Sequence, residues 1–80
     1  MVFTFTAYFE RKVLFKRPYL TRAMCIRVVR KPLRRELQTD GKRVRSWARV
    51  PELDGRVLRV VTLADETTIH NAFPDRRFKP

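Results

Sequence analysis

The sequence predicts one α+β domain over residues 1–80, with two N-terminal helices packed on one face of a four-stranded antiparallel meander sheet. Apolar residues first recur at helical spacing, up to about residue 30, and then alternate with polar residues. An alternating segment has one apolar face that needs a cover, and the two helices are the only candidates for it. The chain has 80 residues, so this core is thin.

The first predicted helix covers Ala7–Lys16, because Phe9 and Val13 lie four residues apart on one face. Thr6 stands before it and is of a residue type that caps free helix N–H groups. The preceding segment Val2–Phe5 alternates apolar residues with threonine. We interpret it as either a short strand or an extended lead-in.

The second predicted helix covers Arg22–Arg30, with Thr21 as its cap and Pro32 beyond its end. Its apolar stripe includes Cys25, the single cysteine. We therefore interpret Cys25 as a core residue, and a lone cysteine indicates a reducing compartment.

A hairpin follows, with strands at 33–38 and 43–50 around Asp40-Gly41, a pair typical of a two-residue type I′ turn. This turn places Gln38 opposite Arg43 and Leu37 opposite Val44. One face then carries Leu33, Leu37, Val44, Ala48 and Val50. The other carries Arg34, Glu36, Arg43, Arg45, Trp47 and Arg49. The first face is predicted to be core, and the second to be a cationic surface around one aromatic ring.

The last two predicted strands are Arg56–Leu63 and Thr67–Phe73. A symmetric turn at Asp65-Glu66 pairs Arg59 with Ala72, which makes Arg59 and His70 diagonal neighbours on one face. A shift of one residue would separate them. In the symmetric register the core face consists of Leu58, Val60, Ile69 and Phe73.

The composition is strongly basic, with 19 Lys and Arg against 8 Asp and Glu and a net charge of +11. Such a charge attracts polyanions, of which nucleic acid is the first candidate, an acidic protein the second and an anionic membrane surface the third. Arginine outnumbers lysine, which favours bidentate contacts to phosphate. No signal peptide and no apolar run of about 20 residues is found, so we expect a cytoplasmic protein without membrane contact.

The residue types present favour metal-independent chemistry on RNA. One histidine, one cysteine and scattered carboxylates give no metal-ligand cluster, and no cofactor motif is found. Cleaving RNA needs an acid or base and cations on the phosphate. The predicted catalytic residues are Arg59, His70, Arg76 and Arg77. The predicted nucleic-acid-binding residues are Arg43, Arg45, Trp47 and Arg49, with Trp47 stacking on a base.

Two of these assignments have structural alternatives. A single histidine on a strand is often a structural hydrogen-bonding residue. The tail allows two arrangements: Phe78 packs on the core while Asp75 pairs with an arginine, or Arg76 or Arg77 closes a site beside Arg59.

The chain resembles the RelE/ParE superfamily of toxins, and more closely BrnT-like proteins and a family of short relatives, nearly from end to end. The residues that carry the resemblance are Arg17-Pro18-Tyr19, Pro32 to Glu36, Trp47 with Val50 to Leu53, Leu58 to Thr62, Thr68 to Phe73, and Asp75 to Phe78. The resemblance implies helices on an antiparallel sheet and a ribonuclease toxin that an antitoxin neutralises by covering its basic face.

The resemblance also implies roles for particular residues. Arg59 matches a site arginine on the third meander strand, and Arg76 or Arg77 matches a second arginine after the last strand. Phe78 stands where many of these toxins have tyrosine, so a role that needs the hydroxyl is lost. Many of the toxins also have a C-terminal helix, and this chain ends at Pro80.

The sequence therefore predicts a small basic toxin-like protein that binds RNA or the ribosome and is a candidate metal-independent endoribonuclease with an acidic antitoxin. Two alternatives stay open: a non-enzymatic nucleic-acid-binding module, and a module whose basic face binds an acidic protein.

Overall fold

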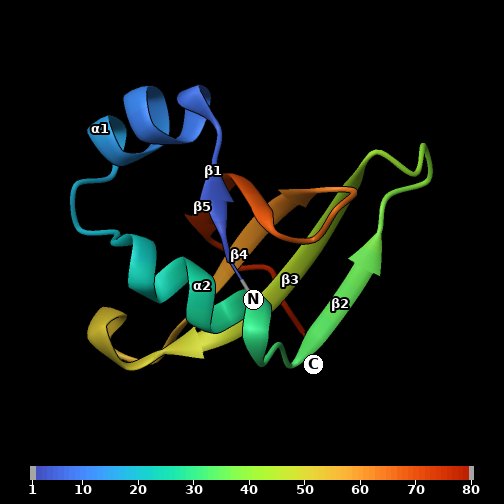
Figure 1. The fold of residues 1–80 in the computed structure, drawn as a ribbon. Coiled ribbons are helices and arrows are strands. Elements are labelled where there is room, and N and C mark those ends of the chain that lie inside the picture. The colour runs from blue at the N-terminus through green and yellow to red at the C-terminus, as the bar shows by residue number, and fades with distance from the viewer. Residues whose placement is uncertain (1, 80) are drawn as a thin grey trace.

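The structure is a computed structural model and describes residues 2–79. Two helical segments precede most of a five-stranded sheet (Figure 1). In chain order the elements are β1 (Thr4–Phe5), the π-helix η1 (Phe9–Val13), α1 (Leu14–Lys16), α2 (Arg22–Arg30), β2 (Arg34–Leu37), β3 (Arg43–Val50), the 3₁₀-helix η2 (Pro51–Leu53), β4 (Arg56–Leu63) and β5 (Thr68–Pro74). The α+β class is confirmed.

The sheet is mixed, so the prediction of four antiparallel strands is wrong. The strand order is β1-β5-β4-β3-β2, and β1 runs parallel to β5 while the other neighbours are antiparallel. The Thr4 and Thr6 amides donate to the Thr67 and Ile69 carbonyls, both at 3.0 Å. The start of the chain is therefore a strand rather than a lead-in, and it pairs what would otherwise be an open edge of β5.

The first helical segment spans residues 7–16, as predicted, but its central turn is a π-helix. The Thr6 hydroxyl accepts from the Phe9 amide at 3.1 Å, which confirms the cap. Phe9 and Val13 are both buried, as their spacing predicts.

Helix α2 begins and ends where the sequence predicts. The Thr21 hydroxyl accepts from the Met24 amide at 3.2 Å and caps its first turn. Cys25 is fully buried, and burial raises the pKa of its thiol to about 12. Its assignment as a core residue is therefore confirmed. No helix within residues 2–79 is long and apolar enough to cross a membrane.

One hydrophobic cluster joins buried residues of the helical segments to alternate residues of the strands. Its strand members are Ala48 and Val50 of β3, Leu58 and Val60 of β4, and Ile69 and Ala72 of β5. Trp47, Val57 and Val61 are also buried but do not belong to this cluster. They alternate with its members along β3 and β4, so their side chains lie on the second face of the sheet.

The β2–β3 register is as predicted, although the turn is not. Glu36 pairs with Arg45 and Leu37 with Val44, and the Gln38 amide donates to the Arg43 carbonyl at 2.9 Å. Among described residues other than glycine, only Asp54 and Glu66 have positive φ, so Asp40-Gly41 is not a type I′ pair. Instead the Gly41 amide donates to the Gln38 carbonyl at 2.9 Å, and of the Asp40-Gly41 pair only Gly41 takes positive φ, at 71°.

The β4–β5 register matches the prediction next to the turn, where Thr62 pairs with Ile69. It shifts between Val61 and Thr62, and beyond that point it differs from the prediction by one residue, so that Arg59 pairs with Phe73 rather than Ala72. Ile69 and Ala72 are both fully buried, yet they lie three residues apart. Because strand side chains alternate, both can reach the core only if one extra residue is inserted between them.

His70 lies in this irregular stretch of β5. Asn71 is the partner of Val61 and Ile69 is the partner of Thr62, so His70 has no partner on β4. The prediction that Phe73 belongs to the core face is also wrong, because the observed register places it beside Arg59 on the second face.

Candidate nucleic-acid interface

The second face of the sheet carries most of the arginines that the sequence singles out. Trp47 on β3 has Arg34 of β2 and Arg59 of β4 as its cross-strand partners. The residues that we call the basic face are Arg34, Arg43, Arg45, Trp47, Arg49 and Arg59. The register thus brings Arg59 together with all four predicted nucleic-acid-binding residues.

Trp47 lies at the centre of this face but is only 6% exposed. Its indole N–H donates to Asp75 Oδ2 at 2.8 Å, and the Phe78 ring stacks on it with centroids 5.7 Å apart. The guanidiniums of Arg34 and Arg59 each lie 5.6 Å from its ring centroid. We call these five residues the Trp47 cluster. Trp47 is therefore covered by its own chain rather than open to a base.

Arg59 is held between two aromatic rings, 5.6 Å from the Trp47 centroid and 5.0 Å from that of Phe73. Its side chain is 25% exposed, and one guanidinium nitrogen lies 4.0 Å from Asp75 Oδ2. Its Nε is buried without a hydrogen-bond partner. Burial, and then repulsion from Arg45, lowers the pKa of Arg59. Because Arg59 is partly buried and lies near a second positive charge, binding of an anion close to its guanidinium is favourable.

Asp75 joins the tail to the basic face. Besides Trp47, its carboxylate accepts from the Arg77 amide at 3.0 Å, and the Asp75 amide donates to the Val57 carbonyl at 2.9 Å. The bond from Trp47 is the main cause that lowers the pKa of this carboxyl. Asp75 thus pairs with an arginine, as one tail arrangement predicts. Phe78 packs on Trp47 of the second face, so the prediction that it packs on the core is wrong.

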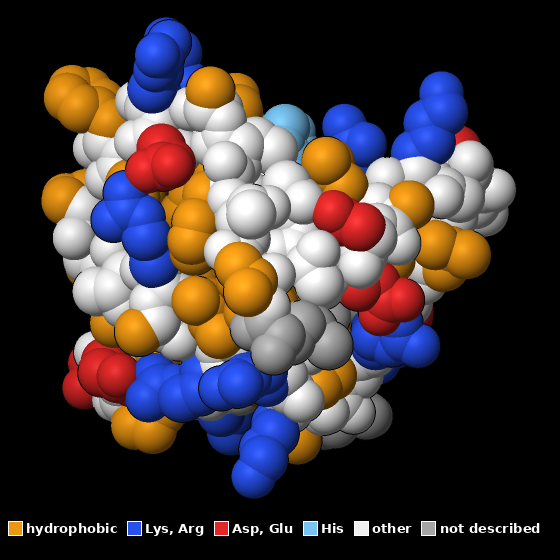
Figure 2. Space-filling model, in the orientation of Figure 1, with side chains coloured by type: hydrophobic (Ala, Val, Ile, Leu, Met, Phe, Trp, Pro, Cys, Tyr) orange, Lys and Arg blue, Asp and Glu red, His pale blue; other side chains and the backbone are white. Residues whose placement is uncertain are grey.

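His70 belongs to a different cluster, at the start of the first helical segment. Its Nδ1 lies 3.0 Å from the Thr6 hydroxyl, and its ring stacks on Tyr8 with centroids 5.0 Å apart. Burial, and then the charge of Arg43, lowers its pKa. Within residues 2–79, no hydrogen bond, ion pair or ring contact joins His70 to Arg59. Figure 2 shows the imidazole reaching the surface.

The three arginines of β3 on the basic face differ from Arg22 and Arg27 of α2 in whether a carboxylate neutralises their charge. Within the described chain, Arg43, Arg45 and Arg49 form no ion pair with a carboxylate. Arg22 and Arg27 of α2 are paired with Glu10 and Glu52, at 2.5 and 2.7 Å. Arg43, Arg45 and Arg49 of β3 therefore present free guanidiniums, whereas Arg22 and Arg27 of α2 present paired ones.

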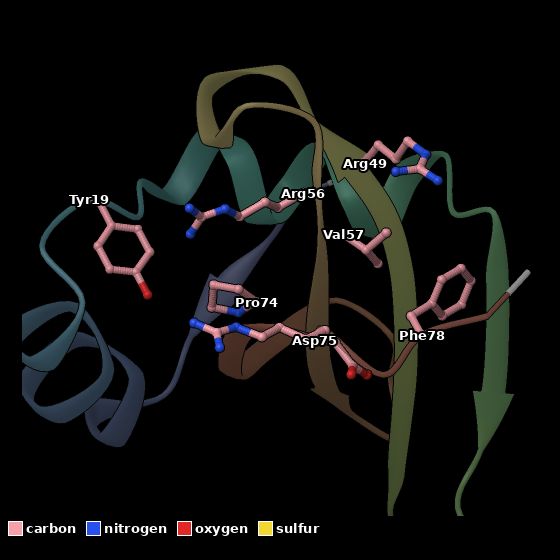
Figure 3. A pocket seen from close by; sticks show the side chains of 8 residues that line it. Tyr19, Arg49, Arg56, Val57, Pro74, Asp75 and Phe78 are labelled. Carbon is pink, nitrogen blue, oxygen red and sulfur yellow. The ribbon is translucent and has the colours of Figure 1, made fainter.

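Next to the Trp47 cluster lies a hollow of about 440 Å³, which we call the terminal hollow (Figure 3). Residues from four parts of the chain line it, among them Tyr19, Arg49, Arg56, Pro74, Arg76 and Phe78. Arg77 lines a separate hollow of about 230 Å³ with Arg34, Trp47 and Phe78. The two predicted site arginines after β5 therefore line different hollows that share Phe78, and of the two only Arg76 lines the terminal hollow.

Sequence reasoning missed Tyr19 and Arg56 as site residues. Tyr19 comes from the loop between the helical segments, and Arg56 begins β4 after the turn at Gly55. No local pattern joins residues so far apart along the chain. A weak signal is that Tyr19 belongs to one of the short segments that carry the toxin resemblance.

Within the described residues, no group of three or more His, Cys, Asp or Glu side chains could hold a metal ion. Comparison of the chain with protein-family models, curated proteins and solved structures finds no match.

Proposed function

We propose that this protein is a toxin-like RNA-binding protein that contacts RNA with the basic face of its sheet. The observation that carries the proposal is the strand register, which collects Arg43, Arg45 and Arg49 with Arg59 on the face opposite the main hydrophobic cluster. Free guanidiniums form strong bidentate contacts with phosphate oxygens. Such a face matches the spaced charges of a nucleic-acid backbone.

In the proposed arrangement the two helical segments cover the other face, as in RelE-like proteins. Support comes from the single cluster that joins Phe9, Val13, Met24 and Val28 to β3, β4 and β5. The helices then support the sheet from one side, and the arginines on the other side stay accessible to the RNA.

Single-stranded or looped RNA fits this surface better than duplex DNA. Sequence-specific readers of duplex DNA usually insert a helix into the major groove. On α2, the candidate for that task, Arg22 and Arg27 are already paired with carboxylates. Backbone binding along a sheet that carries aromatic rings is typical of modules that hold single strands. Phe78 is a half-buried ring that lies over Trp47 on this face.

The proposal has an enzymatic form, metal-independent cleavage. Arg59 would stabilise the charge that builds on the phosphate, because an arginine side chain carries a permanent positive charge. His70 is the acid–base candidate of the described chain, although it lies in the Thr6–Tyr8 cluster. Binding and cleavage therefore need separate tests.

The binding test measures the affinity for a fluorescent single-stranded RNA over a range of salt concentrations. We expect log Kd to rise with log salt, and the slope to fall by about one unit for each arginine removed from the basic face. The test variant is Arg43→Gln/Arg45→Gln, and the matched control is Arg22→Gln/Arg27→Gln, which removes the same charge from α2. Equal slopes in both variants, or an affinity that does not change with salt, would contradict the proposal.

The toxin part is tested by inducing the protein in cells and by incubating it with mRNA, with and without ribosomes. We expect growth arrest and cleavage that survive chelation of metal ions. If RNA binds but neither effect is seen, the protein is a binding module without toxin activity. Competition by an acidic peptide would show that the basic face also fits an acidic antitoxin.

A further inference from the structure

The terminal hollow has two chemically different ends. Figure 3 shows Tyr19 and Arg56 at one end, Arg49 and Phe78 at the other, and Val57 and Pro74 between them. Tyr19, Arg56 and Pro74 also line an adjoining hollow, whereas Phe78 belongs to the Trp47 cluster. One end therefore offers a guanidinium and a phenol, and the other offers a guanidinium and an aromatic ring.

The arginines of the hollow are free of carboxylate partners. Within residues 2–79, none of Arg49, Arg56 and Arg76 forms an ion pair, and Arg49 donates to the Gly55 carbonyl at 3.2 Å. The carboxylate that lines the hollow is Asp75, which already accepts from Trp47 and from the Arg77 amide. The hollow thus keeps an excess of positive charge.

We infer that the terminal hollow binds a phosphate monoester, carried by a nucleotide or by the phosphorylated end of an RNA strand. Arg56 and Arg76 hold the phosphate, the Tyr19 hydroxyl donates to one of its oxygens, and the base lies against Phe78. This inference deepens the proposed function and rests on it. It adds a site for the end of the strand beside the face that holds the backbone.

Charge and size favour a monoester over an internal diester. Near pH 7 a phosphate monoester carries roughly twice the charge of a diester and offers more free oxygens. Several unpaired guanidiniums suit the larger charge, because each can bind two oxygens. The volume of about 440 Å³ lies within the range of roughly 300–1,000 Å³ found for small-ligand sites.

The experiment compares four probes by fluorescence anisotropy or by competition. They are AMP, adenosine, and one short RNA with either a 5′-phosphate or a 5′-hydroxyl. We expect the 5′-phosphorylated RNA to bind about tenfold more tightly than its 5′-hydroxyl form, which corresponds to the loss of one charged hydrogen-bonding group. AMP should compete for the site and adenosine should not. A fifth probe, the same RNA with a 3′-phosphate, shows which end of the strand is held.

The variants separate this site from the basic face. Arg56→Gln should remove the preference for the 5′-phosphate and leave the affinity for the 5′-hydroxyl RNA within about twofold, and Tyr19→Phe should reduce the preference partly. Arg11→Gln is the matched control, because Arg11 is exposed and lies outside the hollow. Thermal unfolding of each variant shows that it is folded.

The outcomes keep the inference and the proposed function apart. Equal binding of both RNA forms, with no competition by AMP, overturns the inference while RNA binding stands. Binding of AMP without any RNA binding supports the hollow and overturns the proposed function. An equal loss for every RNA in Arg56→Gln would make Arg56 a part of the backbone-binding face and would overturn the inference.

Discussion

The Trp47 cluster and the terminal hollow share Phe78 and Asp75 but use arginine in opposite ways. In the cluster, Arg59 lies between two rings and near a carboxylate, and its side chain is 25% exposed. In the hollow, Arg56 and Arg76 are exposed and have no ion-pair partner within the described chain. The position of an arginine on a basic surface is therefore not enough to show that it contacts a ligand.

Because of this difference, we expect mutations in the Trp47 cluster to change stability and mutations in the terminal hollow to change binding. Removing a member of the Trp47 cluster should destabilise the fold, because Trp47 is buried and the other members bond to its indole or pack on its ring. Removing an arginine from the hollow should change binding and leave stability nearly unchanged, since exposed charges contribute little to folding.

The largest expected effect is that of Trp47→Ala on stability. Trp47 is 6% exposed and its indole N–H donates to Asp75, so truncation leaves a cavity and an unpaired acceptor. We expect a loss of about 3–5 kcal/mol in the free energy of unfolding. Urea denaturation measures it, with Phe15→Ala as the control, because Phe15 is 83% exposed and should change stability by less than about 0.5 kcal/mol. A loss for Trp47→Ala as small as the control would mean that the cluster does not stabilise the fold.

Much of the fold followed from local signals in the sequence. The helical spacing of Phe9 and Val13 and the Thr21 cap placed both helical segments, and alternation placed the basic residues of β3 on one face. These features depend on a few neighbouring residues. The sequence left β1 open as a strand or an extended lead-in, and its parallel pairing could not be predicted, because its partner β5 lies far along the chain.

The register of β5 shows why the site was only partly predicted. Ile69 and Ala72 both favour the core, and the extra residue between them moves His70 away from Arg59 and brings Phe73 to it. Several positions could have held that irregularity, and the sequence does not show which. Likewise, Trp47 stood out as an exposed stacking residue because the pattern could not show that Phe78 covers it.

The next largest effect on stability is expected for Asp75→Asn, which removes the negative charge of the Trp47 cluster. The variant should lose about 1–3 kcal/mol near pH 7, because the charged acceptor for the Trp47 indole and for the Arg77 amide becomes neutral. The folded protein has the lower Asp75 pKa, so this stabilisation is complete above the unfolded pKa of about 4 and disappears as the pH falls through the folded pKa.

Urea denaturation from pH 7 to pH 2 measures this dependence. The difference in stability between the native protein and Asp75→Asn should shrink steadily below pH 4. Asp65→Asn is a useful comparison, because hydrogen bonds from Thr68 and Thr67 lower the Asp65 pKa to about 2. Its effect should persist to lower pH. A constant difference between the native protein and Asp75→Asn over the whole range would contradict the assigned cause.

A smaller effect is expected for Arg59→Lys. The substitution keeps the charge but removes the planar group that lies over Trp47 and Phe73. We expect a loss of about 0.5–1 kcal/mol in the free energy of unfolding, the usual size of a cation–π contact. Arg49→Lys is the matched control on the same face, because Arg49 is exposed and contacts no ring within the described chain. Thermal unfolding distinguishes the two, and equal midpoints would count against the ring contacts.

The smallest effect is expected for His70, which lies outside both regions. Its pKa is lower in the folded protein, so its contribution to stability is complete above the unfolded pKa of about 6.5 and is lost as the pH falls through the folded pKa. His70→Gln should therefore flatten the stability profile slightly between pH 8 and pH 5, by less than about 0.5 kcal/mol. RNA affinity at neutral pH should stay within a factor of about two, because the imidazole contacts Thr6 and Tyr8 rather than the basic face. An NMR titration of the imidazole gives the folded pKa directly.

A separate outcome would assign His70 to catalysis. If RNA cleavage is observed and His70→Gln abolishes it while RNA binding is kept, His70 acts in catalysis. His70 and Arg59 must then move closer together when RNA binds.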